Sequence, residues 1–435
     1  MKKLAFFLFL IICTKAIFCQ SDSVLLYKNG AQNSKAKLYA LTQQSIKQNL
    51  SLALTTETEE NWQDAFNAIE VINYQSALVN SKVALAFTQI QNRTPQFQRS
   101  LLELCYAKFP VTYNAIVKKT FDTVSHFKIL AMCGEYLLLP QNKAKFASAI
   151  YTRIENLIKN DSANKTNPFL ISLAINARFQ MGFAKETPTE RALNLLKYVP
   201  DFLSKDYLPG NVIVYSFQRK NRNYPGLAIV RSGDGSFVKD KDDTYFSVPQ
   251  LARSINNLPG YLTNGNTPQG VFKMNGFDVS KLDAIGPTEN LQLALPVECT
   301  KQQYFNDSAI ADNNWQQQDY KNILPKHWRG NVTIYEAFFA GLAGRTEIIA
   351  HGTTVNPDYY KGQPYYPHTP TEGCLCTKEI WSNIDGKRVE SNQQKLIDAV
   401  KKAGGANGYL IVINIEDEQR SVTLKDILPY LKQVN

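Results

Sequence analysis

Two patterns of hydrophobic and polar residues divide the chain near residue 205. Before that point, apolar residues recur at i, i+3, i+4 and i+7 over residues 62–69 and 146–158, which is the spacing of one helix face. Thr94, which precedes a proline, and the sequence TPTE at residues 187–190 are signals for helix N-termini. We therefore expect an all-α domain over residues 22–205, either a bundle or an irregular solenoid.

After residue 205, short runs rich in β-branched and aromatic residues replace the helical spacing. A helical pattern over residues 392–405 ends in glycines, as helices commonly do. We expect a β-rich domain over residues 206–435, so that the fold class is α+β with two domains. The predicted strands cover residues 211–217, 227–232, 331–338, 346–352 and 409–415.

The first 19 residues have the pattern of an export signal. Lysines precede the apolar run LAFFLFLII, which is too short to span a bilayer, and a more polar stretch leads to Cys19. No later segment approaches 18 uninterrupted apolar residues. We expect a signal peptide over residues 1–19 and a mature protein that is periplasmic or secreted, without stable membrane insertion.

The charge of the chain bears on its partners. Removal of Lys2, Lys3 and Lys15 with the signal peptide would lower the formal net charge from +10 to +7. The remaining excess is spread along the chain, with no arginine-rich block and no basic helix. We therefore do not expect a nucleic acid as partner, whereas an anionic cell wall is compatible with this charge.

Cysteines are few, and export would leave an odd number of five where disulfides persist. Cys105 and Cys133 lie on apolar helical stretches, where buried thiols or a helix–helix disulfide would both fit. Cys299 could pair with Cys376 and leave Cys374 free. At least one thiol is then left over or pairs between molecules.

Three stretches of the second half carry candidate chemistry. Within residues 264–274 a turn leads through Thr267 to Gly270, where glycine permits a close approach of backbone or ligand. A predicted strand ends at His351, a position where active sites gather. Cys374 follows the turn TEG. A thiol beside an imidazole is the minimal arrangement for acyl transfer.

The segment after Cys374 affects the reactivity that we expect of its thiol. Residues 377–384 resemble a helix capped by Thr377, so Cys374 would stand just before a helix N-terminus. Such a position lowers the pKa of a thiol and supplies amide donors for an oxyanion.

In this order the three stretches resemble the catalytic domain of the L,D-transpeptidase (YkuD-like) family, over residues 208–416. That family has a TPxGxF segment, then a strand that ends in HG, then a [S/T]HGC motif. Residues 267–272 (TPQGVF) and His351-Gly352 match the first two motifs. Residues 371–374 (TEGC) match the third at three of four positions.

The resemblance implies an exported acyltransferase that acts on peptidoglycan stem peptides and needs no metal or organic cofactor. Cys374 would attack the carbonyl between an L-centre and the following D-alanine. His351 would be the base, oriented by a backbone carbonyl near Gly352, and amides around Gly373 and Cys374 would hold the oxyanion. The thioester would then pass to an amine of a second stem, or to water.

The sequence departs from the family on both sides of the Gly373-Cys374 pair. Glu372 replaces the histidine of HGC, and a carboxylate there would raise the pKa of the thiol unless it points away. Cys376 replaces a polar or basic residue, whose role could pass to Lys378 or Arg345. His368 could take the place of the missing imidazole. The candidate substrate-binding residues are Thr267, Gly270, Arg345, His368 and Glu372.

The same residues permit two other functions. A cell-wall peptide-binding protein without turnover would explain the loss of the family's second histidine. A zinc-stabilised structural domain could use four ligands, which are His351, His368, Cys374 and Cys376. The loop that joins the motifs also carries tyrosines that would form a lid or pack, namely Tyr359, Tyr360, Tyr365 and Tyr366.

Overall fold

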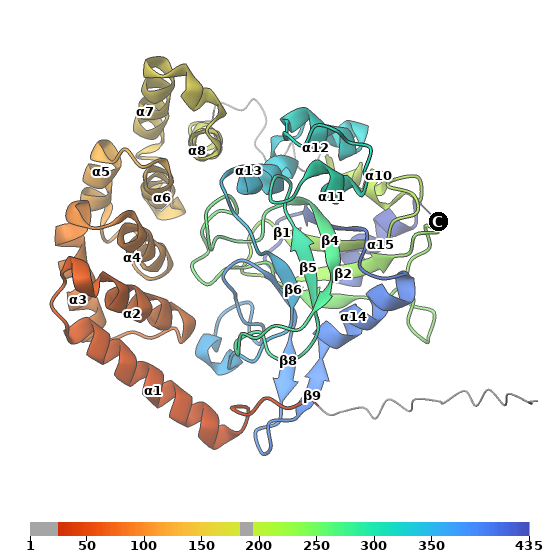
Figure 1. The fold of residues 1–435 in the computed structure, drawn as a ribbon, viewed down its shortest axis with the longest axis horizontal. Helices are drawn as coiled ribbons and strands as arrows, with labels where there is room; N and C mark the ends of the chain where they lie inside the picture. Colours follow the sequence, from red (N-terminus) through yellow and green to blue (C-terminus); the bar gives the residue numbers. More distant parts are fainter. Residues whose placement is uncertain (1–24, 183–194, 435) are drawn as a thin grey trace, which may run out of the picture.

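The computed structural model describes residues 25–182 and 195–434, and it shows an α+β protein with an N-terminal helical region. The predicted signal peptide and the TPTE sequence at residues 187–190 lie outside these residues. We call residues 25–182 the helical region and residues 195–434 the sheet region. Figure 1 shows the helices α1 to α8 following one another in an arc along one side of the sheet region.

The helical region consists of helices that pack on one another through their apolar faces. The two predicted stretches form α2 and α7, and α4 begins at Pro95, where the Thr94 hydroxyl accepts a hydrogen bond from the Phe97 amide (3.3 Å). These predictions are confirmed. The helices are α1 (Gln32–Ser51), α2 (Glu59–Val71), α3 (Ala77–Gln89), α4 (Pro95–Lys108), α5 (Asn114–Thr123), α6 (Phe127–Leu137), α7 (Ala147–Asn160) and α8 (Pro168–Gln180).

The core of the helical region reaches into the sheet region. Its buried cluster includes Leu258, Tyr261 and Leu262, which come from a loop between strands. The Tyr261 hydroxyl donates a hydrogen bond to the Glu135 carboxylate of α6 at 2.7 Å. Burial of apolar surface on both sides fixes the two regions against each other.

An eight-stranded mixed sheet organises the second half in the order β3-β2-β1-β10-β4-β5-β6-β7. The pairs β1–β10 and β6–β7 are parallel, and the other pairs are antiparallel. The strands are β1 (Ile213–Arg219), β2 (Gly226–Arg231), β3 (Val248–Gln250), β4 (Gly270–Asp278), β5 (Asn290–Ala294), β6 (Ile349–His351), β7 (Leu375–Cys376) and β10 (Tyr409–Ile415); β8 (Glu379–Trp381) and β9 (Arg388–Ser391) form a separate hairpin.

Both faces of the central strands are buried, which explains their continuous apolar sequences. On β10, Ile411 and Ile413 belong to one core cluster, whereas Leu410 and Val412 belong to another. Helix α14 covers the second face and ends at Gly404, as predicted. Figure 1 shows the sheet between α14 on one side and α10 and α13 on the other. These helices and their neighbours are α10 (Val199–Leu203), α11 (Lys301–Phe305), α12 (Gln317–Ile323), α13 (Glu336–Leu342), α14 (Asn392–Ala403) and α15 (Leu424–Leu431).

One predicted strand is wrong. Residues 331–338 form a 3₁₀ turn (Val332–Tyr335) and the start of α13. The Asn331 side chain accepts a hydrogen bond from the Thr333 amide at 3.0 Å and so initiates a turn. Ile334 and Phe338 are then four residues apart on one helical face, in the same core cluster. Tertiary burial of that face outweighs the β-branched residues that suggested a strand.

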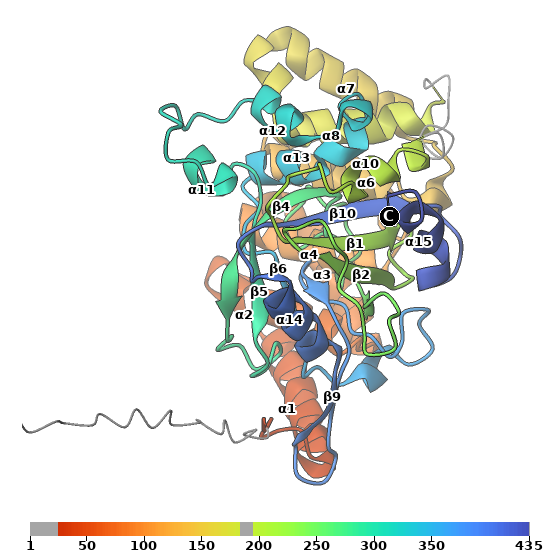
Figure 2. The same cartoon turned by 90° about the vertical axis from the view of Figure 1, so that its right-hand side faces the viewer.

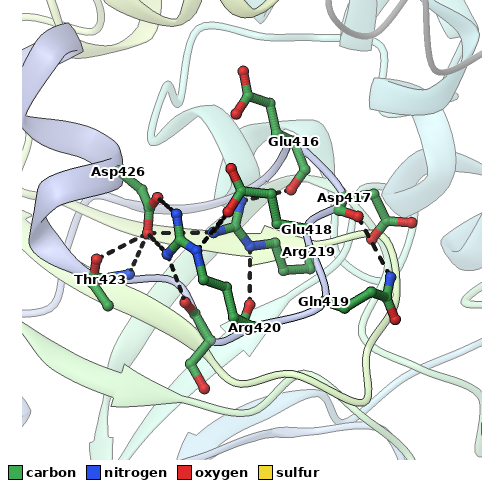
Figure 3. A network of polar contacts seen from close by, with 9 residues as sticks. Arg219, Glu416, Asp417, Glu418, Gln419, Arg420, Thr423 and Asp426 are labelled. Atoms are coloured by element: carbon green, nitrogen blue, oxygen red, sulfur yellow. Dashed lines mark hydrogen bonds and ion pairs between the residues drawn. The ribbon is translucent and has the colours of Figure 1, made fainter.

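A buried arginine fixes the end of the central parallel pair. Figure 3 shows Arg219, the last residue of β1, among residues of the segment that follows β10. Its guanidinium donates to the backbone carbonyls of Glu416 (2.6 Å) and Arg420 (3.2 Å), and it pairs with Asp426 at 3.3 Å. These charge-assisted bonds hold the C-terminal segment on the sheet.

The β8–β9 hairpin links the sheet region to the first helix. Figures 1 and 2 both show it beside the N-terminal end of α1. The Gln32 amide donates to the Asn383 carbonyl at 2.7 Å. Across residues 25–182 and 195–434, no helix is both long and apolar enough to cross a membrane.

Candidate active site

The second and third motifs meet at one edge of the sheet. Strands β6 and β7 run parallel, with Ala350 opposite Leu375 and His351 opposite Cys376. Residues that face each other in a parallel pair, and residues two positions away, point to the same side of the sheet. His351 therefore shares a face with Cys376, and Cys374 lies in the turn directly before β7.

His351 is buried, and one of its two ring nitrogens is held in place. Its Nδ1 is hydrogen-bonded to the Gly352 carbonyl oxygen, so this nitrogen carries the proton. The other nitrogen, Nε2, has no hydrogen-bond partner among the described residues. Burial lowers the pKa of the imidazole to about 4, although the bond to Gly352 opposes this shift. The ring is neutral at pH 7 and offers Nε2 as a proton acceptor.

The Cys374 thiol is crowded by protein atoms, although the residue keeps partial contact with solvent. Its sulfur lies 3.6 Å from the Glu347 carbonyl oxygen and accepts a bond from the Ile349 amide at 3.5 Å. Burial raises the pKa of the thiol to about 11; the Ile349 amide and the Arg345 charge act in the opposite direction. The resting thiol is therefore protonated.

The thiol and the imidazole do not touch in this state. In the described part of the chain, no hydrogen bond joins Cys374 to His351. The sulfur lies at Ile349, the first residue of β6, and His351 stands two residues further along, which corresponds to about 7 Å of strand. Contact between the two groups would require the Cys374 side chain to leave the Glu347 carbonyl.

The helix expected after Cys374 is absent, and that prediction is wrong. Residues 375–376 form β7, and residues 379–381 form β8, which pairs with β9. The Thr377 amide donates to the His351 carbonyl at 2.9 Å and extends the strand pairing. Buried Glu379 and Trp381 alternate with exposed Ile380, which is a strand pattern. The segment after Cys374 therefore supplies no helix N-terminus that would lower the pKa of the thiol.

The turn before Cys374 is tightly specified. Gly373 has φ of 111°, and a Cβ at this position would lie 1.9 Å from the Arg345 side chain. Its amide donates to the Thr371 hydroxyl at 3.0 Å, and that hydroxyl donates to the Cys374 carbonyl at 2.9 Å. The Gly373 amide is thus already used. The Cys374 amide has no partner within residues 25–182 and 195–434 and can face an oxyanion.

Thr267 and Gly270 of the first motif support this turn and the sheet. The Thr267 hydroxyl donates to the Gly373 carbonyl at 2.9 Å. Gly270 opens β4 with φ of 145°, and an added Cβ would lie 2.5 Å from Ala337 and 2.6 Å from the Tyr320 hydroxyl. Thr267 therefore positions the nucleophile turn, and Gly270 permits close packing of helices on the strand.

The two basic candidates for carboxylate binding are both engaged. The Arg345 guanidinium is buried and donates to the carbonyls of Gly260, Gly265 (2.6 Å), Asn266 (2.7 Å) and Gly373 (3.3 Å). Lys378 pairs with Glu390 at 2.9 Å. Arg345 therefore positions the loop around residues 260–266 and the turn at Gly373.

Glu372 is exposed and directed toward the helical region. Its carboxylate accepts a hydrogen bond from the Asn67 side chain of α2 at 3.4 Å. Its charge still contributes to the raised pKa of Cys374, after larger effects. The residue that departs most from the family motif is thus also a contact between the two regions.

His368 and Cys376 lie in a closed environment. Only 8% of the His368 surface is exposed, and neither ring nitrogen has a partner among the described residues. The Cys376 sulfur lies 3.9 Å from the Thr369 hydroxyl, and burial raises the pKa of this thiol to about 12. Backbone bonds to Leu251 at 2.7 and 2.8 Å cover the outer side of β7.

Three of the four tyrosines of the joining loop pack against other residues, whereas Tyr366 is exposed. Tyr360 and Tyr365 are buried with Leu251, and the Tyr360 hydroxyl donates to the Val71 carbonyl at the end of α2 (2.7 Å). The Tyr359 ring stacks on Tyr39 of α1. This loop is therefore a docking element for the helical region.

The cysteines and possible ligands give no support to a disulfide or zinc framework. The five cysteines of the described chain are free thiols, and Cys105 and Cys133 are buried, as one of the two sequence interpretations had it. No group of three or more His, Cys, Asp or Glu side chains in the described residues is placed to hold a metal ion.

Sequence reasoning missed two groups of residues. Thr371 braces the turn from both sides, and a polar stripe of α2 with Asn67 and Glu70 faces the sheet region. The available signal was the helical spacing of polar residues opposite the apolar face of α2, but a solvated face has the same pattern. In comparisons with known proteins, no family model, no curated protein and no solved structure matches this chain.

Proposed function

We propose that the chain is a cysteine acyltransferase of the L,D-transpeptidase type, which forms a thioester at Cys374 with a peptidoglycan stem peptide. One observation carries the proposal. His351 ends β6 and Cys374 directly precedes the adjacent parallel strand β7, while the Gly352 carbonyl fixes the proton on Nδ1 and leaves Nε2 as the base. The three motifs support the substrate class only through their resemblance to that family.

The raised pKa of the thiol and the lowered pKa of the imidazole favour general base catalysis over a preformed ion pair. The pKa of Cys374 near 11 and that of His351 near 4 oppose a preformed thiolate–imidazolium pair. Nε2 therefore takes the thiol proton as the sulfur attacks the carbonyl, which is general base catalysis. The Cys374 amide would donate to the oxyanion, and the imidazolium would protonate the leaving amine.

The second half of the reaction hydrolyses or transfers the thioester. An amine or water attacks the carbonyl carbon, the C–S bond breaks, and the sulfur regains a proton. We propose that the protein works in the cell envelope after removal of residues 1–19. No residue of the described site requires a metal or an organic cofactor for these steps.

A second function, peptide binding without turnover, is favoured by the resting geometry. The Cys374 sulfur contacts the Glu347 carbonyl, not the imidazole, and the pKa of the thiol is raised. Such a protein would bind stem peptides in the same place and would not become acylated. Acylation of Cys374 separates the two functions. The resting geometry does not separate them, because catalytic contacts are often formed only once substrate is bound.

Acylation of the purified protein tests the proposal. Incubation with a carbapenem, which acylates reactive thiols, should add its mass once, and peptide mapping should place the adduct on Cys374. Cys374→Ala should show no adduct, and the matched variant Cys376→Ala should react like the parent. An unmodified parent, or an adduct that persists in Cys374→Ala, contradicts the proposed nucleophile and favours the binding protein.

A further inference from the structure

A cavity of about 290 Å³ lies where the helical region meets the turn before Cys374. Its wall includes Thr371 and Glu372, which are three and two residues before that cysteine. Helix α2 contributes a polar stripe opposite its apolar face, and α4 contributes the other side. Five carboxylates and one arginine line the cavity, namely Glu60, Asp64, Glu70, Glu103, Glu372 and Arg99.

The deepest two carboxylates are unusual because they are almost fully buried. Glu70 is 8% exposed and Glu103 is 5% exposed. Oε1 of Glu70 has no hydrogen-bond partner in the described residues, and Glu70 is one of the residues that line the cavity. Burial, together with the charges of Glu103 and Glu372, raises the pKa of Glu70 well above its usual value. A buried acceptor without a partner is costly, and native proteins rarely keep one without a function.

The cations near this pair compensate its charge only in part, because Arg99 forms an ion pair with Glu103 and yet the pKa of both carboxylates stays raised. The Arg99 Nε lies 3.6 Å from Oε1 of Glu103, beyond hydrogen-bond distance, and Arg99 itself is partly exposed. The Lys108 charge acts on Glu70, but its amine is hydrogen-bonded to the Asn73 side chain. Oε2 of Glu103 also accepts a hydrogen bond from the Asn264 side chain at 3.5 Å, so the carboxylate that the described residues leave least satisfied is that of Glu70.

The arrangement suits an organic cation better than a metal ion. A divalent metal needs several oxygen ligands that converge on one point, and no such group exists in the described residues. The carboxylates instead surround a volume that holds several non-hydrogen atoms, with exposed Glu60 and Glu372 at its rim. A primary ammonium group on a short aliphatic chain fits both the charge and the size.

We propose that this acidic cavity binds the primary ammonium group of the amine that accepts the acyl group from Cys374. The inference rests on the proposed function, because only a transferase needs an amine acceptor. The ammonium must lose one proton before attack, and Glu103, whose pKa burial raises to about 7, can take it. The neutral amine then forms the C–N bond, the C–S bond breaks, and the second proton goes to the thiolate.

Binding of n-butylammonium to the Cys374→Ala protein tests the cavity without turnover. Calorimetry should detect n-butylammonium and not n-butanol. Glu70→Gln and Glu103→Gln should each weaken binding about tenfold, because each removes one charge-assisted hydrogen bond to the ammonium group. The matched control Glu155→Gln, on the exposed side of α7, should bind like the parent. Parental affinity in both cavity variants, or binding of n-butanol as tight as that of n-butylammonium, overturns the inference.

These variants should fold, because each replaces a poorly paired buried carboxylate by an isosteric amide. Their thermal midpoints should match or exceed that of the parent. A lowered midpoint together with lost binding would mean that the carboxylates are structural, and it would overturn the assignment of a ligand site.

The partition of the acyl-enzyme between amide formation and hydrolysis tests whether the cavity takes part in the reaction. With a tetrapeptide stem and n-butylamine, the Glu103→Gln protein should form the thioester at the parental rate within about twofold. Its ratio of amide to hydrolysed product should fall about tenfold. If Cys374 is never acylated, the proposed function fails while the calorimetric result still stands. If acylation and butylammonium binding are normal but the ratio is unchanged, the cavity is not the acceptor site.

Discussion

His351 with Cys374 can be compared with His368 with Cys376, because the same two residue types occur twice around β7. The first histidine has one nitrogen bonded to a carbonyl and the other without a partner, and the first cysteine reaches solvent. The second histidine has two buried nitrogens without partners, and the second cysteine is fully covered. Orientation and access, not residue identity, distinguish a candidate catalytic pair from a packed one.

The comparison also shows what accompanies the replacement of the family's histidine by Glu372. The family motif would place an imidazole at Glu372, and His368 was the candidate replacement. Glu372 instead contacts Asn67, and His368 is enclosed without a polar partner. We therefore expect a single histidine, His351, to carry the proton transfers.

The largest predicted difference lies between the two cysteines. Cys374→Ala should lower turnover of a tetrapeptide stem by at least about a thousandfold, because the nucleophile is lost. Cys376→Ala should stay within about tenfold of the parent, since it removes only a buried sulfur. Steady-state release of D-alanine measures both. Comparable losses in the two variants would remove the distinction between the sites.

The two histidines should differ almost as much. His351→Ala should lower the rate of acylation by about a hundredfold to ten-thousandfold, the range for a general base. His368→Leu should leave that rate within about twofold and should raise the thermal midpoint, because two unsatisfied buried nitrogens disappear. Slow acylation in a well-folded His368→Leu protein would show that His368 takes part in the reaction.

Both histidines should make stability fall in acid, with the same sign. Burial lowers the pKa of each to about 4, so the unfolded chain binds more protons between about pH 6.5 and pH 4. The free energy of unfolding should therefore decrease as pH falls through this window, by at most about 3 kcal/mol for each histidine. Urea titrations at several pH values should show a shallower slope in His351→Gln and in His368→Gln. An unchanged slope in either variant would mean that its imidazole titrates normally.

Two glycines near the candidate nucleophile give the smallest contrast. Gly373→Ala should destabilise the fold by about 2–4 kcal/mol, because a Cβ there meets Arg345 and φ is positive. Gly362→Ala has positive φ but open space, and it should cost about 1 kcal/mol. Urea unfolding measures both. Equal costs would show that the turn at Gly373 relaxes freely.

Elements with regular spacing could be predicted from sequence, and loops that depend on distant contacts could not. Helices α2, α4 and α14 and strands β1 and β10 follow local periodicity. Residues 331–338 and 377–384 were assigned wrongly because short amphipathic runs fit both periods, and burial or strand pairing decides between them. The engagement of Arg345 with four carbonyls could not be predicted from its neighbours in sequence.

The candidate site likewise has one part that could be predicted from the sequence and one part that could not. Motif order and strand ends indicated His351 and Cys374, and the parallel pairing of β6 with β7 brings the two segments side by side. The absence of a helix after Thr377, the occupied Gly373 amide and the buried carboxylates of the helical region all depend on tertiary structure. No local pattern distinguishes Glu70 from a solvated glutamate on the same helix.

The position of β10 determines when the sheet can be completed during synthesis of the chain. This late strand lies between β1 and β4, so a nascent chain without residues 409–415 holds two half-sheets, β3-β2-β1 and β4-β5-β6-β7. The helical region, with its local contacts, can fold early during synthesis. The half-sheets stay apart with open edges until the final strand joins them. A chain truncated before residue 409 would therefore still contain every catalytic side chain proposed above. These side chains would lie in a half-sheet that is not joined to β1.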